Sequence, residues 1–543
     1  MPTDSTRPET PSPAPKIAPT PAPMPTPQPQ KSEKAPNAGD TPATTNDTDA
    51  NQTLEIDHKP KIIISPGNGH VEADLAEAAI AADGRHYTNG SELVRLADRG
   101  DGLILERVNE HTLRLELSAS IDWGRQNQNS ITVRCDPPHA VITALLHSQD
   151  RRHLKPLNGL AHQPYLGPDG RLVSEPGYHP ESRMYAAFDP EDFRLGEPTF
   201  EAAKASAEAI KDLLSEYDFE TDVDRSAVVA AALTASVRSS LPLAPAISIT
   251  ATTSGSGKSH MAEVLAAFAS PGEPKRGSYP NSEEEARKLM MSLFMEKPAV
   301  MIFDDKQEHW KPYGTMNRSL TSPTITDRLL GMNRMSTVST NVLLIGTGNN
   351  IEAERDMRRR VLTSRLAPPV EDPSQRTYAK DPLAIIRERR AEYVGHALTI
   401  IRAYQEAGSP TPNVRSIGSY DEWSRHCRHP LIWLGFPDPA QSILDQVSHD
   451  PDKEALAQFL AIWFHVFDTE SVTTREIVER AGHDTRLMEA MDDLPVSDGR
   501  GINPGKLGWF ISKNRGRRAG GGSSPGPNRR GDRGASCRKA AAR

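Results

Sequence analysis

Residues 246–269 read AISITATTSGSGKSHMAEVLAAFA, and this stretch decides the fold class. An apolar strand over Ala246–Thr250 enters a loop of small residues that ends in GKS at 257–259, where a helix begins and runs to Phe268. Glycines let a backbone approach a phosphate chain closely, and the N-terminus of a helix favours negative charge. The stretch therefore predicts a phosphate-binding loop between a strand and a helix.

The polar positions of this loop predict ATP and Mg²⁺ as ligands. We expect Lys258 to reach the β and γ phosphates and the Ser259 hydroxyl to ligate Mg²⁺. The usual pattern begins with glycine, whereas here the first position is Thr252. The expected nucleotide-binding residues are Thr252, Thr253, Ser254, Gly255, Ser256, Gly257, Lys258 and Ser259.

A second apolar strand, Ala299–Phe303, runs directly into Asp304 and Asp305. Acids at the C-terminal end of a strand that follows a phosphate-binding loop are typical of a Walker B motif. We expect Asp304 to hold Mg²⁺ through water and Asp305 to polarise the attacking water. Many ATPases carry Glu at the second position, so the shorter Asp305 is a less typical base.

A third strand, Val342–Ile345, ends in GTGNN. A polar residue at this strand end can bridge the γ-phosphate and the attacking water, the role called sensor 1. Asn349 is the expected residue and Asn350 the alternative. An Asn/Gly turn without such a role is the other interpretation.

Five arginines fall between Arg355 and Arg365. An arginine supplied by a neighbouring subunit can stabilise the charge of the γ-phosphate. Arg359 and Arg360 are the candidates for this role. The alternative is a basic helix face that only meets solvent.

The order TTSGSGKS, AVMIFDD, NVLLIGTGNN and DMRRRVL resembles the superfamily 3 / AAA+ type helicase ATPases of phage and mobile-element primase-helicases. The phrases PYLGPDGRLVSEPGYHPESRMY, LTASVRSSLPLAPAISITA and YDEWSRHCRHPLIWLGFPDP are similar to replication ATPases of prophages and integrative elements. The resemblance spans roughly residues 85–510. It implies a parallel sheet of order 5-1-4-3-2, a homo-oligomeric ring, ATP, Mg²⁺ and DNA. Two residues depart from the family's pattern. Thr252 stands at the first position of the phosphate-binding motif, where glycine is usual, and Asp305 follows Asp304 at a position where relatives often carry Asn.

The resemblance also implies DNA contacts outside the ATPase motifs. A hairpin within DRLLGMNRMSTVSTN places Arg334 against a DNA phosphate, with a surface arginine on a loop as the alternative. The run NPGKLGWFISKNRGRR resembles the recognition helix of a winged helix. Lys506, Lys513 and Arg515 are the DNA-binding candidates on it, although the expected wing strands do not follow.

The chain of 543 residues divides by composition and periodicity into six segments around an α/β P-loop core. Residues 1–60 hold 14 of the 46 prolines, and the first aromatic residue is Tyr87. The periodicity of 381–408 predicts one long helix ended by Gly408 and Pro410. The expected segments are a disordered proline-rich tail (1–60), an α+β accessory domain (61–200), the P-loop ATPase domain (201–370), a helical domain (371–467), a winged-helix-like region (468–515) and a disordered basic tail (516–543).

Charge and cysteine content exclude several classes of protein. The net charge of −8 excludes a wholly basic, histone-like DNA binder. Three cysteines without a CxxC pair exclude a disulfide framework and a zinc ribbon. We find no apolar run near the roughly 20 residues of a membrane helix and no apolar signal core, so we expect a cytoplasmic protein without a membrane partner. From Lys513 onward, ten basic residues face one acid, which indicates nucleic-acid binding or a degenerate end.

Three functions compete on this evidence. The leading hypothesis is an ATP-driven DNA motor, a replicative helicase of a phage or mobile element that acts on single-stranded DNA with replication partners. The alternative is an ATP-gated DNA-binding initiator or assembly protein without strong unwinding. A primase with an appended ATPase is the third, and the absence of a hydrophobic-DxD strand argues against it.

Overall fold

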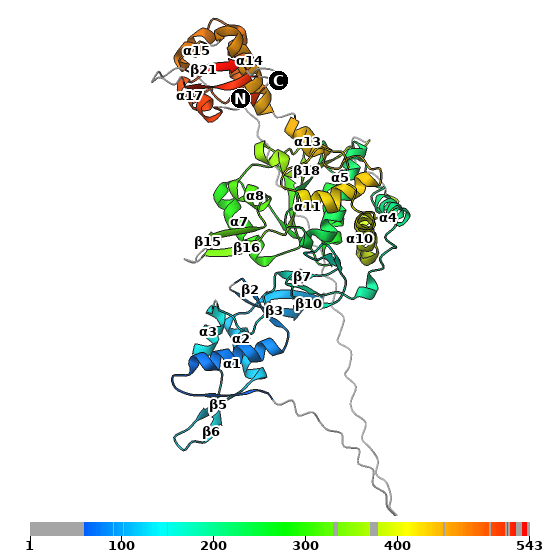
Figure 1. Ribbon diagram of the computed structural model, residues 1–543, viewed down its shortest axis with the longest axis vertical. Coiled ribbons are helices and arrows are strands. Elements are labelled where there is room, and N and C mark those ends of the chain that lie inside the picture. The colour runs from blue at the N-terminus through cyan, green and yellow to red at the C-terminus, as the bar shows by residue number, and fades with distance from the viewer. Residues whose placement is uncertain are drawn as a thin grey trace, which may run out of the picture. The chain divides into compact units, whose positions relative to one another are not determined.

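The computed structural model describes residues 59–515, except for 91, 101, 149, 329–334, 370–377, 449–450, 469 and 499–500, and the backbone of three short strands beyond residue 517 (Figure 1). Residues 1–58 lie outside this part, so the disordered proline-rich tail stays a prediction. None of the helices in the described ranges combines the length and the apolar character that crossing a membrane requires.

Residues 61–147 fold into two small sheets and three helices, and most of their buried apolar residues belong to one cluster. Strands β1 and β5 pair in parallel and β6 joins antiparallel, while β2, β3 and β4 form an antiparallel meander. Ile80, Leu113 and Trp123 are buried in the cluster. The elements are β1 (Lys61–Ile64), α1 (Gly69–Ala82), β2 (His86–Asn89), β3 (Glu92–Asp98), β4 (Leu103–Arg107), α2 (Glu110–Ser120), β5 (Asp122–Gln126), β6 (Thr132–Arg134) and α3 (His139–His147).

A run of very short strands follows, and one glutamine fixes it to the helices of the next part. The Gln163 amide donates to the carbonyl oxygens of Ser236 (2.6 Å) and Phe268 (3.0 Å), which lie near the ends of two core helices. These strands are β7 (Gly159–Ala161), β8 (Tyr165–Leu166), β9 (Leu172–Val173), β10 (Gly177–His179) and β11 (Met184–Ala186).

A five-stranded parallel sheet forms the core, and it confirms the α/β class expected from the sequence. The strand order is β18-β12-β17-β14-β13, which reads 5-1-4-3-2 when the strands are numbered along the chain. A two-stranded hairpin, β15–β16, lies outside this sheet. The strands are β12 (Ala246–Ala251), β13 (Lys275–Gly277), β14 (Val300–Lys306), β15 (Thr324–Arg328), β16 (Met335–Ser339), β17 (Leu343–Asn349) and β18 (Val361–Leu366), with helices α4 (Phe200–Leu213), α5 (Asp222–Val237), α6 (Lys258–Ala269), α7 (Glu283–Glu296) and α8 (Gly314–Ser319).

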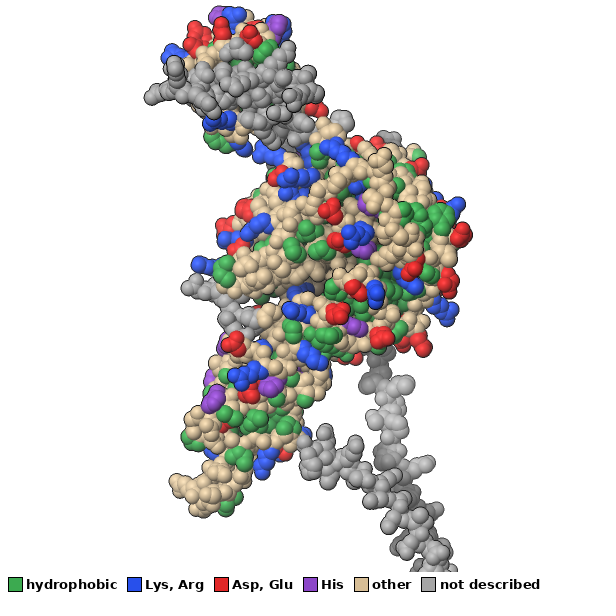
Figure 2. Space-filling model, in the orientation of Figure 1, with side chains coloured by type: hydrophobic (Ala, Val, Ile, Leu, Met, Phe, Trp, Pro, Cys, Tyr) green, Lys and Arg blue, Asp and Glu red, His purple; other side chains and the backbone are tan. Residues whose placement is uncertain are grey.

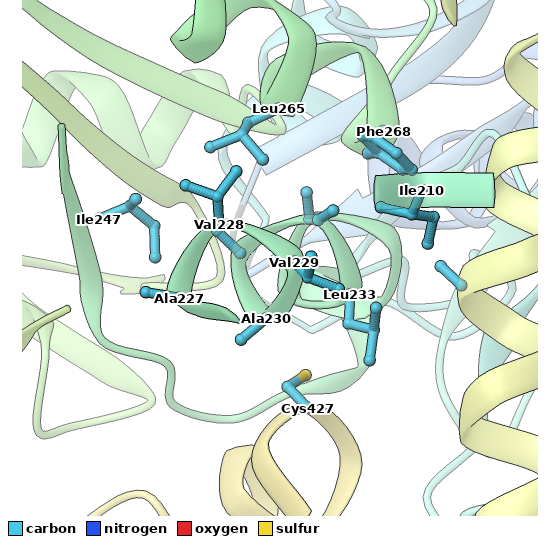
Figure 3. Close-up of a cluster of buried hydrophobic side chains, with 14 of the residues drawn as sticks. Ile210, Ala227, Val228, Val229, Ala230, Leu233, Ile247, Leu265, Phe268 and Cys427 are labelled. Atoms are coloured by element: carbon cyan, nitrogen blue, oxygen red, sulfur yellow. The ribbon is translucent and has the colours of Figure 1, made fainter. Parts of the chain in front are cut away.

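Helix α5 is the centre of the largest apolar cluster (Figure 3). Thr221 caps it by accepting from the Asp224 amide, and its small apolar residues let it be buried on nearly all sides. Cys427 lies against it, fully buried, and burial raises the pKa of this thiol to about 12. Figure 3 shows α5 residues Ala227, Val228, Val229, Ala230 and Leu233 among Ile210, Ile247, Leu265 and Phe268.

The single helix expected over 381–408 is wrong, because the chain forms two helices there. Arg389 leaves the helical conformation, with φ −115° and ψ 33°. This break accompanies the burial of the Arg390 guanidinium, which donates to the Ala267 carbonyl (2.7 Å) and to Gln163. The helices from here on are α9 (Pro382–Glu388), α10 (Arg390–Glu406), α11 (Asp421–Trp423), α12 (His429–Trp433), α13 (Gln441–Ser448), α14 (Pro451–Phe467), α15 (Thr474–Ala481), α16 (Thr485–Asp492) and α17 (Pro504–Lys513).

Three short strands follow α17, where the sequence predicts an unstructured basic tail without wing strands. They are β19 (Arg518–Ala519), β20 (Gly522–Pro527) and β21 (Ala535–Lys539), and they pair antiparallel. Their Gly, Ser and Arg residues lack the alternation of apolar and polar positions by which strands are recognised in a sequence.

Two glycines of β17 let β14 pack closely beside it. The register between the two strands shifts between Phe303 and Lys306. A Cβ at Gly346 would meet the ring of Trp310, and a Cβ at Gly348 would meet the backbone oxygen of Lys306, in both cases inside van der Waals distance. The two glycines of the GTG sequence are therefore required by the packing of Lys306 and Trp310 against β17.

We predict that Gly348→Ala destabilises the protein by about 1–3 kcal/mol, because the clash is with backbone rather than with a mobile side chain. Thermal unfolding followed by circular dichroism measures the change. Gly69→Ala is the matched control, since a Cβ there has open space within 4 Å. Equal melting temperatures for the Gly348→Ala protein and the unmodified chain would contradict the assignment.

Candidate functional site

The loop between β12 and α6 turns at two glycines. Gly255 has a φ of +73° and Gly257 a φ of +85°, in the left-handed region that disfavours residues with a Cβ. A Cβ at Gly257 would also lie 3.3 Å from the ring of Tyr217. Because Gly257 caps α6, the helix begins directly at Lys258, and the N-terminus of the helix meets the end of the loop. This is the arrangement that favours a bound phosphate group.

Lys258 is buried and folded back onto its own loop. Its Nζ donates to the Thr253 carbonyl (2.9 Å) and to Ser256 Oγ (3.0 Å). Burial lowers the pKa of Lys258, although the nearby Asp305 and Asp304 oppose the shift. Within the described ranges, the hydroxyl of Thr253 is buried without a hydrogen-bond partner. An unpartnered hydroxyl and a lysine held only by loop oxygens fit a loop that takes up an anionic group such as a triphosphate.

Asp304 joins three elements through one oxygen. Its Oδ1 accepts from Ser259 Oγ (2.7 Å), from Thr347 Oγ1 (2.6 Å) and from the Asp305 amide (3.1 Å). Its Oδ2 faces Arg276, whose Nη1 is 3.7 Å away. Burial by itself raises the pKa of Asp304, but these donors and the guanidinium outweigh it, so the pKa lies below its usual value. The carboxylate is therefore charged at neutral pH and lies beside a serine hydroxyl, a donor pair that suits Mg²⁺.

Asp305 lies where the ladder between β14 and β17 changes register. Its φ is +45°, which is uncommon for a residue other than glycine and occurs preferentially at functional sites. Its amide donates to Thr347 Oγ1 (3.1 Å), while its side chain is exposed. Water can therefore reach the carboxylate, as the expected role of a base requires.

The structure places Asn349 and Asn350 at the exposed end of β17. Asn349 is paired with Ala251, and the Asn350 amide donates to the Ala251 carbonyl (3.0 Å), so both stand next to the start of the phosphate-binding loop. The residue of this strand that contacts Asp304 is Thr347, which the sequence reasoning missed. Its signal was its place two residues before Asn349, on the same side of the strand.

The two candidate arginines differ in exposure. Arg359 is the last residue of a 3₁₀ segment after β17, Arg355–Arg359, and Arg360 caps that segment. The side chain of Arg359 is 59% exposed and pairs with Asp356 (3.0 Å). Arg360 is 8% exposed and donates to the Asp356 carbonyl, and burial, followed by repulsion from Arg359, lowers its pKa. Of the two, only Arg359 therefore presents its guanidinium at the surface.

A second chain of contacts ties the phosphate-binding helix to the region after the sheet. The Tyr217 hydroxyl lies 2.7 Å from His260 Nδ1, and His260 Nε2 lies 3.2 Å from a carboxylate oxygen of Asp381. Asp381 in turn caps α9. The sequence carried no signal for this chain, because its members are far apart and belong to no local motif.

The expected DNA-binding residues fall into two groups. Arg334 lies outside the described residues, between β15 and β16. Lys506 and Lys513 lie on α17, and Arg515 follows it; all three are exposed.

Comparisons with known proteins give only distant likenesses. No family model and no curated protein matches the chain. Among solved structures, the apo NrS-1 C-terminal region is similar over 86% of this chain and 99% of its own, at 10% identity and a TM-score of 0.38. Two JCV helicase structures are similar over smaller parts. The one with a bound acetamide compound covers 34% of this chain and 55% of its own at 10% identity, and the other covers 44% and 60% at 14% identity, each with a TM-score of 0.20. All three TM-scores lie below 0.5, and none of the identities exceeds 14%.

We predict that Thr347→Val weakens Mg²⁺-dependent ATP hydrolysis. The change removes one donor to the Asp304 carboxylate, so its pKa rises and the carboxylate is protonated at a higher pH. The acid limb of the rate profile therefore moves to higher pH, and the Mg²⁺ concentration for half-maximal rate rises by roughly tenfold. ATPase rates against pH and Mg²⁺ measure both effects.

Thr363→Val is the matched control for this prediction. Thr363 is a buried threonine of β18 whose hydroxyl accepts from Gln446 (3.2 Å) rather than contacting Asp304. A folded Thr347→Val protein with an unchanged pH profile and Mg²⁺ dependence would show that the bond to Asp304 does not matter.

Proposed function

We propose that this chain is a P-loop ATPase of the superfamily 3 / AAA+ helicase type. It uses ATP and Mg²⁺ to move along single-stranded DNA, and it acts in the replication of a phage or mobile element. The observation that carries the proposal is the 2.7 Å bond between Ser259 and Asp304. It joins the phosphate-binding loop to the acid at the end of β14, and these are the two parts that Mg²⁺–ATP requires together.

Within this proposal each residue of the site has a role that its position supports. Lys258 neutralises the β and γ phosphates, and Ser259 and Asp304 hold Mg²⁺. Asp305, exposed beside them, polarises the attacking water. Asn349 contacts the γ-phosphate and the attacking water from the end of β17, while Thr347 orients Asp304.

Assembly into a homo-oligomeric ring is part of the proposal. Arg359 has the exposure that a residue acting on a neighbour's γ-phosphate needs, and it pairs with Asp356, which is itself exposed. Arg360, buried behind it, supports the segment from which Arg359 projects. The support for this step is the difference in exposure between the two arginines.

The experiment that tests the function compares the unmodified chain with Lys258→Ala. We expect hydrolysis of ATP that single-stranded DNA stimulates, together with displacement of a labelled strand from a forked duplex. Lys258→Ala leaves triphosphate charge uncompensated, so hydrolysis falls at least roughly a hundredfold and displacement ceases. Near-normal turnover by a folded Lys258→Ala protein would refute the site.

Strand displacement separates the proposed motor from the ATP-gated initiator. An initiator binds DNA and assembles in an ATP-dependent way, yet it displaces no strand. DNA-stimulated hydrolysis without displacement, at concentrations where the protein is oligomeric, would therefore replace the motor by the initiator. The ATPase assignment survives that outcome.

We predict that Arg359→Ala keeps its affinity for ATP and loses turnover, because an arginine supplied by a neighbour accelerates phosphoryl transfer by roughly 10³–10⁵ in other systems. Mixing Arg359→Ala with Lys258→Ala then restores part of the hydrolysis, since each subunit supplies what the other lacks. ATPase rate against mixing ratio is the measurement. Arg475→Ala is the control, because Arg475 is an exposed arginine of α15 that belongs to none of the ATPase motifs. A monomeric protein with full activity, or a mixture without rescue, would count against the shared site.

A further inference from the structure

Helix α17 exposes a tryptophan on its outer face. Leu507, Phe510 and Ile511 bury the inner face, whereas Trp509 is 61% exposed. Four other tryptophans, at positions 123, 310, 423 and 463, are buried to 2% exposure or less. Exposing a large apolar ring to water costs free energy in proportion to its area, so this position calls for a partner that covers it.

Basic side chains share the face with Trp509. Lys506 and Lys513 stand three residues before and four residues after it, the spacings that place side chains on one side of a helix. The Lys513 ammonium lies 4.7 Å from the centre of the Trp509 ring. The Lys506 ammonium donates to the Ser497 carbonyl (2.7 Å), at the other end of the stripe. The face is therefore one aromatic ring between two cations.

Charge selects the kind of partner. Residues 501–515 contain three basic residues, Lys506, Lys513 and Arg515, and no acid. The nearest acid before them, Asp498, accepts a hydrogen bond from Asn503 (2.8 Å). On the face of the molecule seen in Figure 2, by contrast, acidic and basic side chains are interspersed over the described elements. A helix face with basic residues, no acids and an exposed aromatic ring is complementary to a polyanion that carries flat apolar groups.

We propose that the Lys506–Trp509–Lys513 face of α17 binds single-stranded nucleic acid, with a base stacked on Trp509 and the flanking phosphates beside the two lysines. Bases of a single strand offer open faces to an aromatic ring, whereas those of a duplex are stacked on one another. The lysines then neutralise phosphates and release counterions. The proposed function supplies only the identity of the strand as DNA; the stacking chemistry is independent of ATP.

The test measures binding of a fluorescein-labelled oligo(dT) to the full chain without nucleotide, by anisotropy. We expect Trp509→Ala to weaken binding by roughly tenfold and Trp509→Phe to retain most of the affinity. Lys513→Ala reduces the salt dependence of binding by about one phosphate contact. Arg486→Ala, which removes an exposed arginine of α16 paired with Asp484, is the matched charge control and leaves binding unchanged.

Acrylamide quenching of tryptophan fluorescence gives a second readout. Trp509 is the most accessible indole of the described residues, so bound oligo(dT) protects it and the quenching constant falls. Unchanged affinity in Trp509→Ala overturns the proposal, as does tighter binding of a duplex of the same length without protection of Trp509. The proposal is also overturned if sedimentation shows that Trp509→Ala dissociates an oligomer, because the face is then a contact between copies of the chain.

These outcomes stay separate from those of the ATPase site. Trp509→Ala is expected to hydrolyse ATP at the normal rate in the absence of DNA, and Lys258→Ala to bind oligo(dT) normally without nucleotide. Failure of stacking therefore leaves the ATPase proposal standing, and failure of hydrolysis leaves the stacking face standing.

Discussion

The site depends on the hydrogen bonds that the Asp304 carboxylate accepts. One oxygen gathers the first turn of α6, the end of β14 and the interior of β17, because its three donors come from Ser259, Asp305 and Thr347. Its position requires β14 and β17 to lie close together, which Gly346 and Gly348 permit. The packing of the sheet and the geometry of the proposed Mg²⁺ site are thus a single constraint, and a substitution that opens one disturbs the other.

Local signals explain what the sequence could predict. The strand, the glycine loop and the helix around Lys258 are contiguous, and so are the apolar run and the acids at Asp304 and Asp305. Each can be recognised from neighbouring residues alone, and the structure brings these two motifs into contact. The role of Thr347 depends instead on a register shift between two strands, which no single stretch of sequence records.

The missed features depend on distant partners. The helical periodicity continues through Arg389, so nothing local marks the break between α9 and α10; the buried contacts of Arg390 come from Gln163 and Ala267. Arg359 and Arg360 are adjacent and identical in type, and the burial that separates them arises from the tertiary fold. In both cases the difference, in backbone conformation or in burial, arises only in the folded chain.

The buried thiol of Cys427, which lies against α5, can report when the apolar cluster around this helix opens. Thiolate is the reactive form of cysteine, and burial raises the pKa of Cys427 to about 12, so the folded core protects it from alkylating reagents. Alkylation of Cys427 then requires the cluster around α5 to open, and its rate measures the free energy of that opening. Mass spectrometry of the labelled peptide can follow how nucleotide changes the cohesion of the core without any introduced probe.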